Sequence, residues 1–269
     1  MSYAAWEPRP SLWWWSLKQP FSVVERCGGL VATEERVRAA RYATAALRAG
    51  KLVGWAGLRL VLGRALDQDP RRIRLGRAAG GKPFLVEGGL GFNLAHTRDT
   101  AVCALWRGGA VGVDIEASRP DPGAALWTAA TAHERLWCAA VEGEERARRL
   151  LTVWIRKEAY LKALGVGLAA PMTSACFCRL AGTAGQMGPW RTRDFSLTAD
   201  LTGSVCWHAG GRDGERPDRW EGGCARPLAI EQAMVIRALP LAGMLAGAVE
   251  TGTLVAAPGA DWDLGYEGG

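Results

Sequence analysis

The sequence predicts an α+β fold, and three observations support this class. Short apolar and aromatic segments typical of strands stand beside longer segments typical of helices, without the regular strand–helix–strand order of a parallel α/β sheet. No segment repeats with a period of 20–50 residues, which excludes a solenoid. The 269 residues are 49% hydrophobic and 22% charged, so the composition suits a globular chain with one large domain or two smaller ones.

Six elements are expected in the first half of the chain. An aromatic run between two prolines predicts a strand over residues 11–17. Thr33 is expected to act as the N-cap of a helix over residues 36–48, because two glutamates follow it in the first turn. A second helix over 52–66 should end before Pro70, since the residue before a proline is pushed out of the helical region. Short apolar runs predict strands over residues 91–95, 100–106 and 110–115.

The second half begins with helical segments and continues with β-structure. Helices are predicted over residues 132–150 and 151–164, and Gly165 stands where a C-terminal glycine is expected. Residues 212–226 are rich in Gly, Asp and Arg and are expected to form a loop. Further strands are predicted over residues 176–180, 194–199 and 205–207.

Positive charge is concentrated in one N-terminal stretch. The net charge is +6, but residues 36–82 hold 12 Lys or Arg against two acids. If the helix is continuous, four basic residues lie on one of its sides: Arg38, Arg41, Arg48 and Lys51. Such a row is either a solvated helix face or a surface for an anionic partner such as a nucleic acid or a phosphate-rich ligand.

Cysteine use and the N-terminus indicate a cytoplasmic protein. The seven cysteines are odd in number and scattered, with no C-x-x-C pair, so buried and reduced thiols are expected. Charges interrupt every run long enough to span a bilayer, and the first residues lack the arrangement of a signal peptide. No membrane partner is expected.

Two carboxylates follow an apolar run in VGVDIE, residues 111–116. Asp114 and Glu116 are two residues apart, so a strand places both on the same face. Oxygen ligands of this kind suit Mg²⁺, which commonly takes one or two carboxylates together with waters and substrate phosphates. The alternative is a solvent-exposed strand end.

Two further motifs carry candidate functional groups. In WIRKEAYLK, residues 154–162, Glu158 and Lys162 share one helix face, which suits either a functional pair or an ordinary surface ion pair. In FNLAHT, residues 92–97, His96 ends a predicted strand and is either a structural or a catalytic histidine.

Together the three motifs resemble the 4′-phosphopantetheinyl transferases of the Sfp type. They occur in the order FNLAHT, VGVDIE, WIRKEAYLK, separated by 13 and 37 residues. The family pattern is aromatic-Asn-apolar-Ser-His-Ser, then apolar-Gly-apolar-Asp-apolar-Glu, then Trp-x-x-Lys-Glu-Ala/Ser-x-x-Lys. The GKP turn at residues 81–83 and the basic segment at 36–51 match further family elements. The resemblance covers residues 12–171 well and the rest only loosely.

The resemblance implies transfer of the phosphopantetheine arm of coenzyme A to a serine of an acidic acyl or peptidyl carrier protein, as a holo-acyl-carrier-protein synthase does. Adenosine 3′,5′-bisphosphate would be released, and Mg²⁺ would be required. The implied fold is two similar α+β lobes, residues 1–110 and 111–269, related by a pseudo-twofold axis with the ligand cleft between them. A monomer would then hold the whole site as a pseudo-dimer. The motifs do not specify a fatty-acid, polyketide or nonribosomal-peptide carrier.

The resemblance also implies a role for each candidate residue. The metal ligands would be Asp114, Glu116 and Glu158. The catalytic residues would be Glu158, as the base for the serine hydroxyl, with Lys162 and His96 beside the phosphates. Coenzyme A would be contacted by Arg38, Arg41, Lys51, Lys82, His96, Asp114 and Lys162. Ala95 replaces a family serine, so only its backbone N–H remains for a phosphate.

Two other classes of protein fit parts of the sequence. A nucleic-acid-binding module should interleave aromatic side chains with its basic residues, but only Tyr42 and Trp55 do so between residues 36 and 82. If the protein were a non-enzymatic metal-binding scaffold, the order of the three motifs would have no explanation. The sequence therefore favours the transferase, with no nucleic-acid partner.

Overall fold

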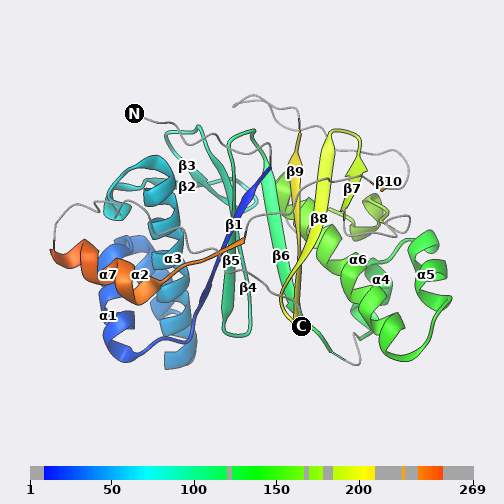
Figure 1. Cartoon of the computed structure of the whole chain (residues 1–269), viewed down its shortest axis with the longest axis horizontal. Helices are drawn as coiled ribbons and strands as arrows, with labels where there is room; N and C mark the ends of the chain where they lie inside the picture. Colours follow the sequence, from blue (N-terminus) through cyan, green and yellow to red (C-terminus); the bar gives the residue numbers. More distant parts are fainter. Residues whose placement is uncertain are drawn as a thin grey trace, which may run out of the picture. The chain divides into compact units, whose positions relative to one another are not determined.

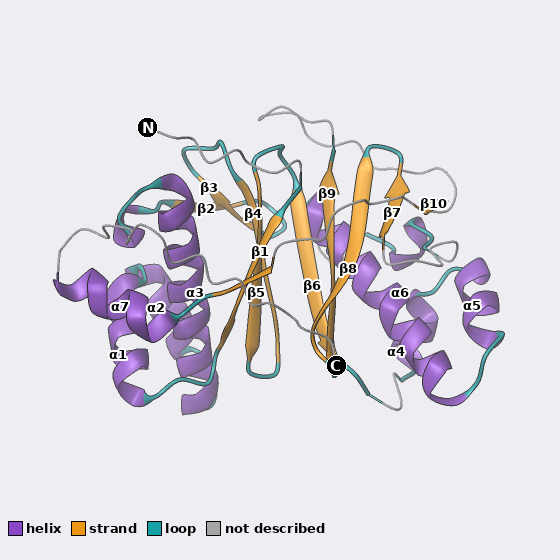
Figure 2. Cartoon of the chain, in the orientation of Figure 1, coloured by secondary structure: helices purple, strands orange, loops and turns teal. Residues whose placement is uncertain are grey.

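The structure is a computed structural model of the chain and has a mixed α+β fold, which confirms the predicted class (Figure 2). It describes residues 9–119, 123–166, 170–177, 184–209, 226–227 and 236–250. The chain forms two compact units, one from Met1–Leu12 and Arg74–Val235, the other from Trp13–Ile73 and Ile236–Gly269. The lobes expected at 1–110 and 111–269, and their pseudo-twofold relation, stay predictions.

The first unit contains an antiparallel five-stranded sheet in the order β10-β7-β8-β9-β6 (Figure 1). Its strands are β6 (Val111–Ala117), β7 (Ala184–Met187), β8 (Trp190–Thr198), β9 (Leu201–His208) and β10 (Arg226–Pro227). The register places Asp114 of β6 opposite Ser204 of β9, and Ser204 opposite Asp194 of β8. Directly paired residues point to one face, so these three polar side chains form a row across the sheet.

The first unit also contains two hairpins. One joins β4 (Gly91–Thr97) to β5 (Thr100–Trp106), and the other joins β2 (Leu75–Arg77) to β3 (Pro83–Leu85). Asn93 of β4 is buried, and its Oδ1 accepts a hydrogen bond of 2.9 Å from the backbone N–H of Val113. An amide side chain thus ties β4 to the edge of β6 that does not pair with β9.

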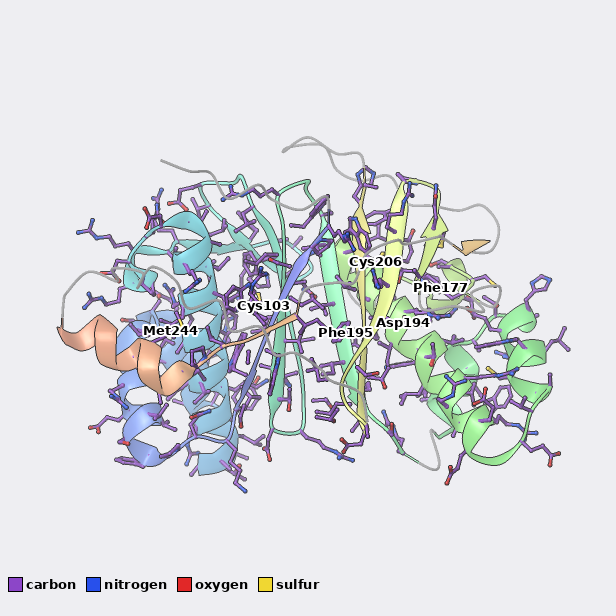
Figure 3. All side chains as sticks on the ribbon, in the orientation of Figure 1. Cys103, Phe177, Asp194, Phe195, Cys206 and Met244 are labelled. Carbon is purple, nitrogen blue, oxygen red and sulfur yellow. The ribbon has the colours of Figure 1, made fainter. Side chains whose placement is uncertain are left out.

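Three helices pack together in the first unit. They are α4 (Ala124–Ala129), α5 (Ala132–Ala139) and α6 (Gly143–Leu164), and a 3₁₀ turn follows at Met172–Ser174. Helix α6 lies against β6, β9 and β8 (Figure 1). Its buried Tyr160 packs edge-on against Trp190 of β8, with ring centroids 5.4 Å apart, and against Phe177 (labelled in Figure 3), with centroids 6.4 Å apart. This apolar cluster fixes the helix on one face of the sheet.

Gly112 explains how closely α6 approaches β6. A Cβ atom at this position would lie 2.1 Å from the carbonyl oxygen of Ala159 and 2.3 Å from the backbone nitrogen of Ala163. Only glycine lets the two backbones come this close. The glycine of the VGVDIE motif therefore has a packing role, and it brings the two acids of β6 next to the helix.

The second unit is mainly helical. Its elements are β1 (Ser11–Ser16), where the chain passes from the first unit into the second, α1 (Phe21–Leu30), α2 (Thr33–Ala40), α3 (Ala45–Leu66), a 3₁₀ turn (Pro70–Arg72), β11 (Ile236–Ala238) and α7 (Leu241–Glu250). The buried ring of Trp15 packs on the backbone of α3, because a Cβ at Gly57 would lie 2.3 Å from the indole. Apolar burial of this kind holds α3 in the unit.

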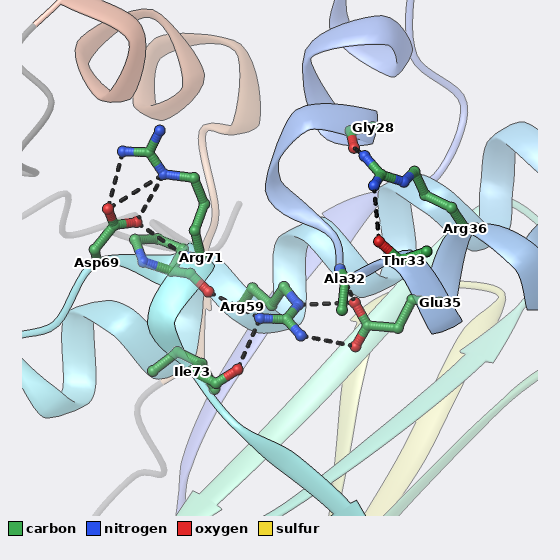
Figure 4. A network of polar contacts seen from close by, with 10 residues as sticks. Gly28, Ala32, Thr33, Glu35, Arg36, Arg59, Asp69, Arg71 and Ile73 are labelled. Atoms are coloured by element: carbon green, nitrogen blue, oxygen red, sulfur yellow. Dashed lines mark hydrogen bonds and ion pairs between the residues drawn. The ribbon is translucent and has the colours of Figure 1, made fainter.

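A buried ion pair joins α2 to α3 (Figure 4). Arg59 Nε donates to Glu35 Oε2 at 2.8 Å, and Nη2 donates to Oε1 at 3.2 Å. Arg59 Nη1 donates to the carbonyl oxygens of Pro70 and Ile73 at 3.0 and 2.9 Å. Glu35 also accepts from the Ala32 N–H at the start of α2. Four hydrogen bonds from Arg59 offset much of the cost of burying its charge.

The predicted helix over residues 36–48 is wrong. Helix α2 begins one residue after its N-cap, Ala32, and ends at Ala40, while α3 begins at Ala45 and continues through Gly50. The Thr44 hydroxyl accepts a hydrogen bond from the Leu47 N–H and so caps a new helix. The four basic residues therefore do not lie on one continuous helix. Helix α1 was not predicted.

The predicted break between the two later helices is also wrong. Helix α5 ends at Ala139, and α6 begins at Gly143, whose φ of 58° lies in the left-handed region, and continues without interruption to Leu164. Gly165 does end this helix with φ 73°, as predicted. Parts of two other predicted elements, residues 178–180 and most of 212–226, lie outside the described residues.

Five cysteines lie in the part of the chain that the structure describes, and all five are buried thiols: Cys27, Cys103, Cys138, Cys176 and Cys206. Cys178 and Cys224 lie outside it. Within the described residues, no helix is both long enough and apolar enough to cross a membrane.

Candidate active site

The acids of β6 and the charged pair of α6 face each other in the first unit. Lys162 Nζ lies 2.5 Å from Asp114 Oδ1 and 4.0 Å from Glu158 Oε2. Asp114 is buried, with 5% of its surface exposed, and Glu158 is half-buried one helical turn before Lys162. The structure therefore brings together three residues that the sequence analysis took from two separate motifs.

Burial raises the pKa values of Asp114 and Glu158. Desolvation raises the pKa of Asp114 to about 6, Lys162 opposes the rise, and the charges of Glu158 and Glu116 add to it. Desolvation also raises the pKa of Glu158, again against Lys162 and with a contribution from Glu116. Three carboxylates therefore repel one another around a single ammonium group, an arrangement that a further positive charge would stabilise.

The donor chemistry of this group fits Mg²⁺. Asp114 Oδ2 is buried without a hydrogen-bond partner, so one carboxylate oxygen is available inside the site. Two more carboxylates, Glu116 and Glu158, act electrostatically on Asp114, and oxygen ligands are those that Mg²⁺ prefers. Among the described residues, no set of three or more His, Cys, Asp or Glu side chains is already arranged to hold a metal ion. Metal binding at Asp114, Glu116 and Glu158 stays a prediction.

Strand β4 contributes Thr97 next to Glu116. The Thr97 hydroxyl donates to Glu116 Oε2 at 3.4 Å, and Arg119 Nη2 lies 3.5 Å from the same oxygen. Asn93 and Thr97 are four residues apart on a strand, so they share the face of β4 that contacts β6. Threonine in place of the family's second serine therefore still supplies a hydroxyl at the site.

Alternation along β4 separates His96 from this contact. His96 is exposed and points to the opposite face from Asn93 and Thr97. Ala95, on the same face as those two, is buried and lies opposite Val102 of β5. The predicted phosphate contacts of His96 and of the Ala95 backbone N–H stay predictions.

Lys82, another predicted phosphate contact, has backbone partners. Its Nζ donates to the carbonyl oxygens of Val111, Lys162 and Ala163 at 2.8, 2.6 and 3.3 Å. Desolvation lowers the pKa of Lys82 to about 8. The side chain thus connects the start of β6 to the end of α6.

The other basic candidates belong to the second unit. Arg38 on α2 and Arg41 just after it are exposed. Lys51 Nζ lies over the ring of Tyr42, 5.0 Å from its centroid, while Arg48 donates to the carbonyl oxygens of Tyr42 and Ala43. Two of the four basic residues therefore pack around the corner between α2 and α3. Coenzyme A binding by Arg38, Arg41 and Lys51 stays a prediction.

The two residues before Glu158 have buried partners that were not predicted. Arg156 forms a two-pronged ion pair with Asp194 of β8, with Nη2 to Oδ2 at 2.6 Å. Lys157 Nζ lies 2.8 Å from Glu134 Oε2, and both side chains are at most 1% exposed. Each pair fixes α6 directly beside the candidate base, Glu158.

Glu134 and Lys157 also hold the segment after α6. Glu134 Oε1 accepts from the Phe177 N–H at 2.6 Å, and Lys157 donates to the carbonyl oxygens of Met172 and Ala175. The spacing of Thr131 and Glu134 is that of a capping box, which the sequence could have revealed. Asp194 carried no such signal, because its partner is 38 residues away.

Comparison with known proteins gives one consistent family. The model of the 4′-phosphopantetheinyl transferase superfamily matches residues 110–212, which include β6, α6 and β9. The 4′-phosphopantetheinyl transferase HetI of Nostoc sp. is 30% identical over 182 residues, which cover 61% of this chain and 76% of HetI. A putative 4′-phosphopantetheinyl transferase of Synechocystis sp. is 28% identical over 206 residues, 72% of this chain and 82% of the relative. AcpT of Salmonella typhimurium, another 4′-phosphopantetheinyl transferase, is 35% identical over 114 residues, 41% of this chain and 58% of AcpT.

Proposed function

The chain belongs to the 4′-phosphopantetheinyl transferase superfamily, and we propose that it transfers the phosphopantetheine arm of coenzyme A to a serine of an acidic apo carrier protein. Adenosine 3′,5′-bisphosphate is the second product. The observation that carries the proposal is the meeting of Asp114, Glu158 and Lys162 on β6 and α6, within the residues that match the family. The protein acts as a monomer in the cytoplasm.

The reaction exchanges one phosphorus–oxygen bond for another. The serine oxygen of the carrier forms a bond to the phosphorus that bears the pantetheine arm, and the bridging bond of the pyrophosphate breaks. The serine proton passes to Glu158, directly or through a water, and the electron pair of the broken bond leaves with adenosine 3′,5′-bisphosphate. Glu158 is half-buried and lies one helical turn from Lys162, and a carboxylate held in place in this way can act as a general base.

Lys162 places a positive charge where negative charge develops on the pyrophosphate. Its ammonium already lies between two carboxylates, so little reorganisation is needed at the moment of reaction. Asp114, Glu116 and Glu158 would hold Mg²⁺, which supplies further positive charge to the phosphate oxygens when bound. The unpartnered Asp114 Oδ2 supports this ligand set.

Basic side chains supply the remaining contacts to coenzyme A. Arg38, Arg41 and Lys51 bind its phosphates, together with His96 and the backbone N–H of Ala95. Arg38 and Arg41 are exposed, which leaves their guanidinium groups accessible to a ligand. Guanidinium groups suit phosphates because their planar fork donates two parallel hydrogen bonds.

The direct test is a transfer assay read by mass spectrometry. The protein is incubated with coenzyme A, Mg²⁺ and apo carrier proteins of the fatty-acid, polyketide and nonribosomal-peptide classes. One added phosphopantetheine is expected on the carrier serine, and a Ser→Ala carrier is the control. If the folded protein modifies none of these carriers, the proposed function is wrong.

A further inference from the structure

Lys82 joins the two elements that carry the proposed site. It stands in the turn between β2 and β3, yet its Nζ donates to Val111 at the start of β6 and to Lys162 and Ala163 at the end of α6. A lysine ammonium has three N–H donors, so these three carbonyl oxygens account for all of them. The residue whose carbonyl lies 2.6 Å from Lys82 is the same residue whose ammonium pairs with Asp114.

The contact lies where α6 is closest to β6. Val111 precedes Gly112, whose missing Cβ lets the backbone of Ala159–Ala163 touch the strand. At this distance no side chain separates the two backbones, so a slide of α6 along β6 directly changes the position of Lys162 relative to Asp114. A clamp at this point therefore controls the geometry of the site.

A cation at the C-terminal end of helix α6 is stabilising. The last carbonyl groups of a helix have no partner within the helix, and its C-terminus carries partial negative charge. The Gly165 N–H bonds to the carbonyl oxygens of Leu161 and Lys162, while Ala163 is reached by Lys82. The ammonium group of Lys82 thus completes the C-terminal cap of α6.

The turn that carries Lys82 is shaped for this position. The Ala78 N–H donates to the Lys82 carbonyl at 2.9 Å, and Arg77 Nη1 donates to the Gly81 carbonyl at 2.8 Å. A Cβ at Gly80 would lie 2.7 Å from the carbonyl oxygen of Gly165, so only glycine fits against the end of α6. The glycines before Lys82 let the turn lie directly on the helix terminus.

We propose that Lys82 is a positioning residue, which fixes the end of α6 on β6 and thereby holds Lys162 and Glu158 in place opposite Asp114. It takes this role in place of the predicted contact to a coenzyme A phosphate. The catalytic consequence rests on the proposed function, whereas the clamp itself does not.

Hydrogen–deuterium exchange tests the clamp without any substrate. In Lys82→Met, which keeps the chain length but removes the ammonium, backbone amides of residues 163–166 should exchange about tenfold faster or more, because the helix end opens more often. Arg74→Met is the matched control, since it removes one exposed positive charge beside the same hairpin. Equal exchange in Lys82→Met and the wild type overturns the proposal. If Lys82→Met does not fold, Lys82→Gln, which keeps two N–H donors, takes its place.

Steady-state kinetics separates positioning from ligand binding. Lys82→Met should lower kcat about tenfold or more at saturating coenzyme A, with its KM within about threefold of the wild type. A raised KM with unchanged kcat would identify Lys82 as a phosphate ligand and overturn the proposal. An unchanged kcat and KM would overturn it too.

A double variant distinguishes positioning from a purely structural role. If Lys82 acts in part through Lys162, the loss of kcat per folded protein in Lys82→Met/Lys162→Met should be smaller than the product of the two single losses. Independent, multiplicative losses would count against the proposal. If the wild-type protein modifies no carrier, the proposed function fails while the exchange experiment still decides the clamp.

Discussion

At the scale of the residue, the site depends on how one buried carboxylate is partnered. Asp114 Oδ1 pairs with Lys162, while Oδ2 has no hydrogen-bond partner. A buried and unpaired carboxylate oxygen is costly to keep in a folded protein. Such a cost is typical of a group that meets its partner only when a ligand binds.

Asp114→Asn and Glu158→Gln should respond differently to Mg²⁺. Asp114→Asn removes one charge from the proposed metal site, so transfer activity should fall sharply and recover in part at high Mg²⁺. Glu158→Gln also removes the proposed base, so its loss of about 10²–10⁴-fold should persist at any Mg²⁺ concentration. The measurement is carrier modification across a Mg²⁺ titration, with circular dichroism to confirm folding. If the transfer activity of both variants recovers equally with Mg²⁺, Glu158 is a metal ligand and not the base.

At the scale of the element, α6 is held by ion pairs on both sides of its backbone. Arg156 reaches β8, and Lys157 reaches Glu134 of α5 and the segment after α6. A buried ion pair adds little stability compared with apolar side chains at the same positions. Removing one partner, however, leaves the other charge buried and uncompensated. The three charged residues Arg156, Lys157 and Glu158 therefore have separate roles.

Breaking the Lys157–Glu134 pair should destabilise the protein strongly. Lys157→Met leaves the Glu134 carboxylate buried without its cation, so the free energy of unfolding should fall by about 3–5 kcal/mol. Glu87→Gln, which breaks the exposed pair with Arg74, is the control and should change the free energy of unfolding very little. Both values are measured by urea denaturation. Similar small losses of unfolding free energy in the two variants would show that the buried pair contributes no more to stability than the exposed one.

The close approach of α6 to β6 predicts a large effect at Gly112. A Cβ in Gly112→Ala would meet helix backbone at 2.1 Å, so α6 must shift, and stability should fall by about 1–3 kcal/mol or more, together with transfer activity. Gly50→Ala in α3 is the matched control. Its Cβ would meet nothing within 4 Å, so it should stabilise the protein by about 0.5–1 kcal/mol. Thermal unfolding compares the two, and a Gly112→Ala variant as stable as the wild type would refute the packing argument.

At the scale of the whole molecule, positive charge is collected in residues 36–82 while the net charge is only +6. A local excess of one sign attracts anions more strongly than a uniform distribution does. Part of this charge is used internally, because Arg59 is buried with Glu35 and Arg48 holds a helix corner. Exposed residues such as Arg38 and Arg41 remain for an anionic ligand.

Removing basic side chains of the second unit should weaken binding of coenzyme A selectively. Arg38→Ala combined with Lys51→Ala should raise the KM for coenzyme A about tenfold or more with little change in kcat, since the contacts concern binding. Arg36→Ala is the control, because its guanidinium already donates to Gly28 and Thr33. A fall in kcat at unchanged KM would contradict this role. Tight, salt-sensitive binding of the wild type to nucleic acid would favour the rival class instead.

Some of this protein can be predicted from local patterns. Two acids two residues apart share a strand face, and Glu158 and Lys162 share a helix face, because these relations depend only on backbone period. The order of the three motifs indicated the family, which the comparisons confirm. The strands β1, β4, β5 and β6 were predicted from short apolar or aromatic runs, which are a property of the local sequence. The sequence by itself therefore determined the family and which residue types could do the chemistry.

The tertiary structure decided which groups those residues meet. Lys82 lies 80 residues from the carbonyl of Lys162, and Arg156 lies 38 residues from Asp194. Asn93 contacts Val113, and Thr97 contacts Glu116, while His96 between them faces away. Such partners are chosen by packing, here by the contact of α6 with β6 at Gly112, and no local period encodes it. A charge in the sequence becomes a ligand, a base or a clamp only when the fold fixes its neighbours.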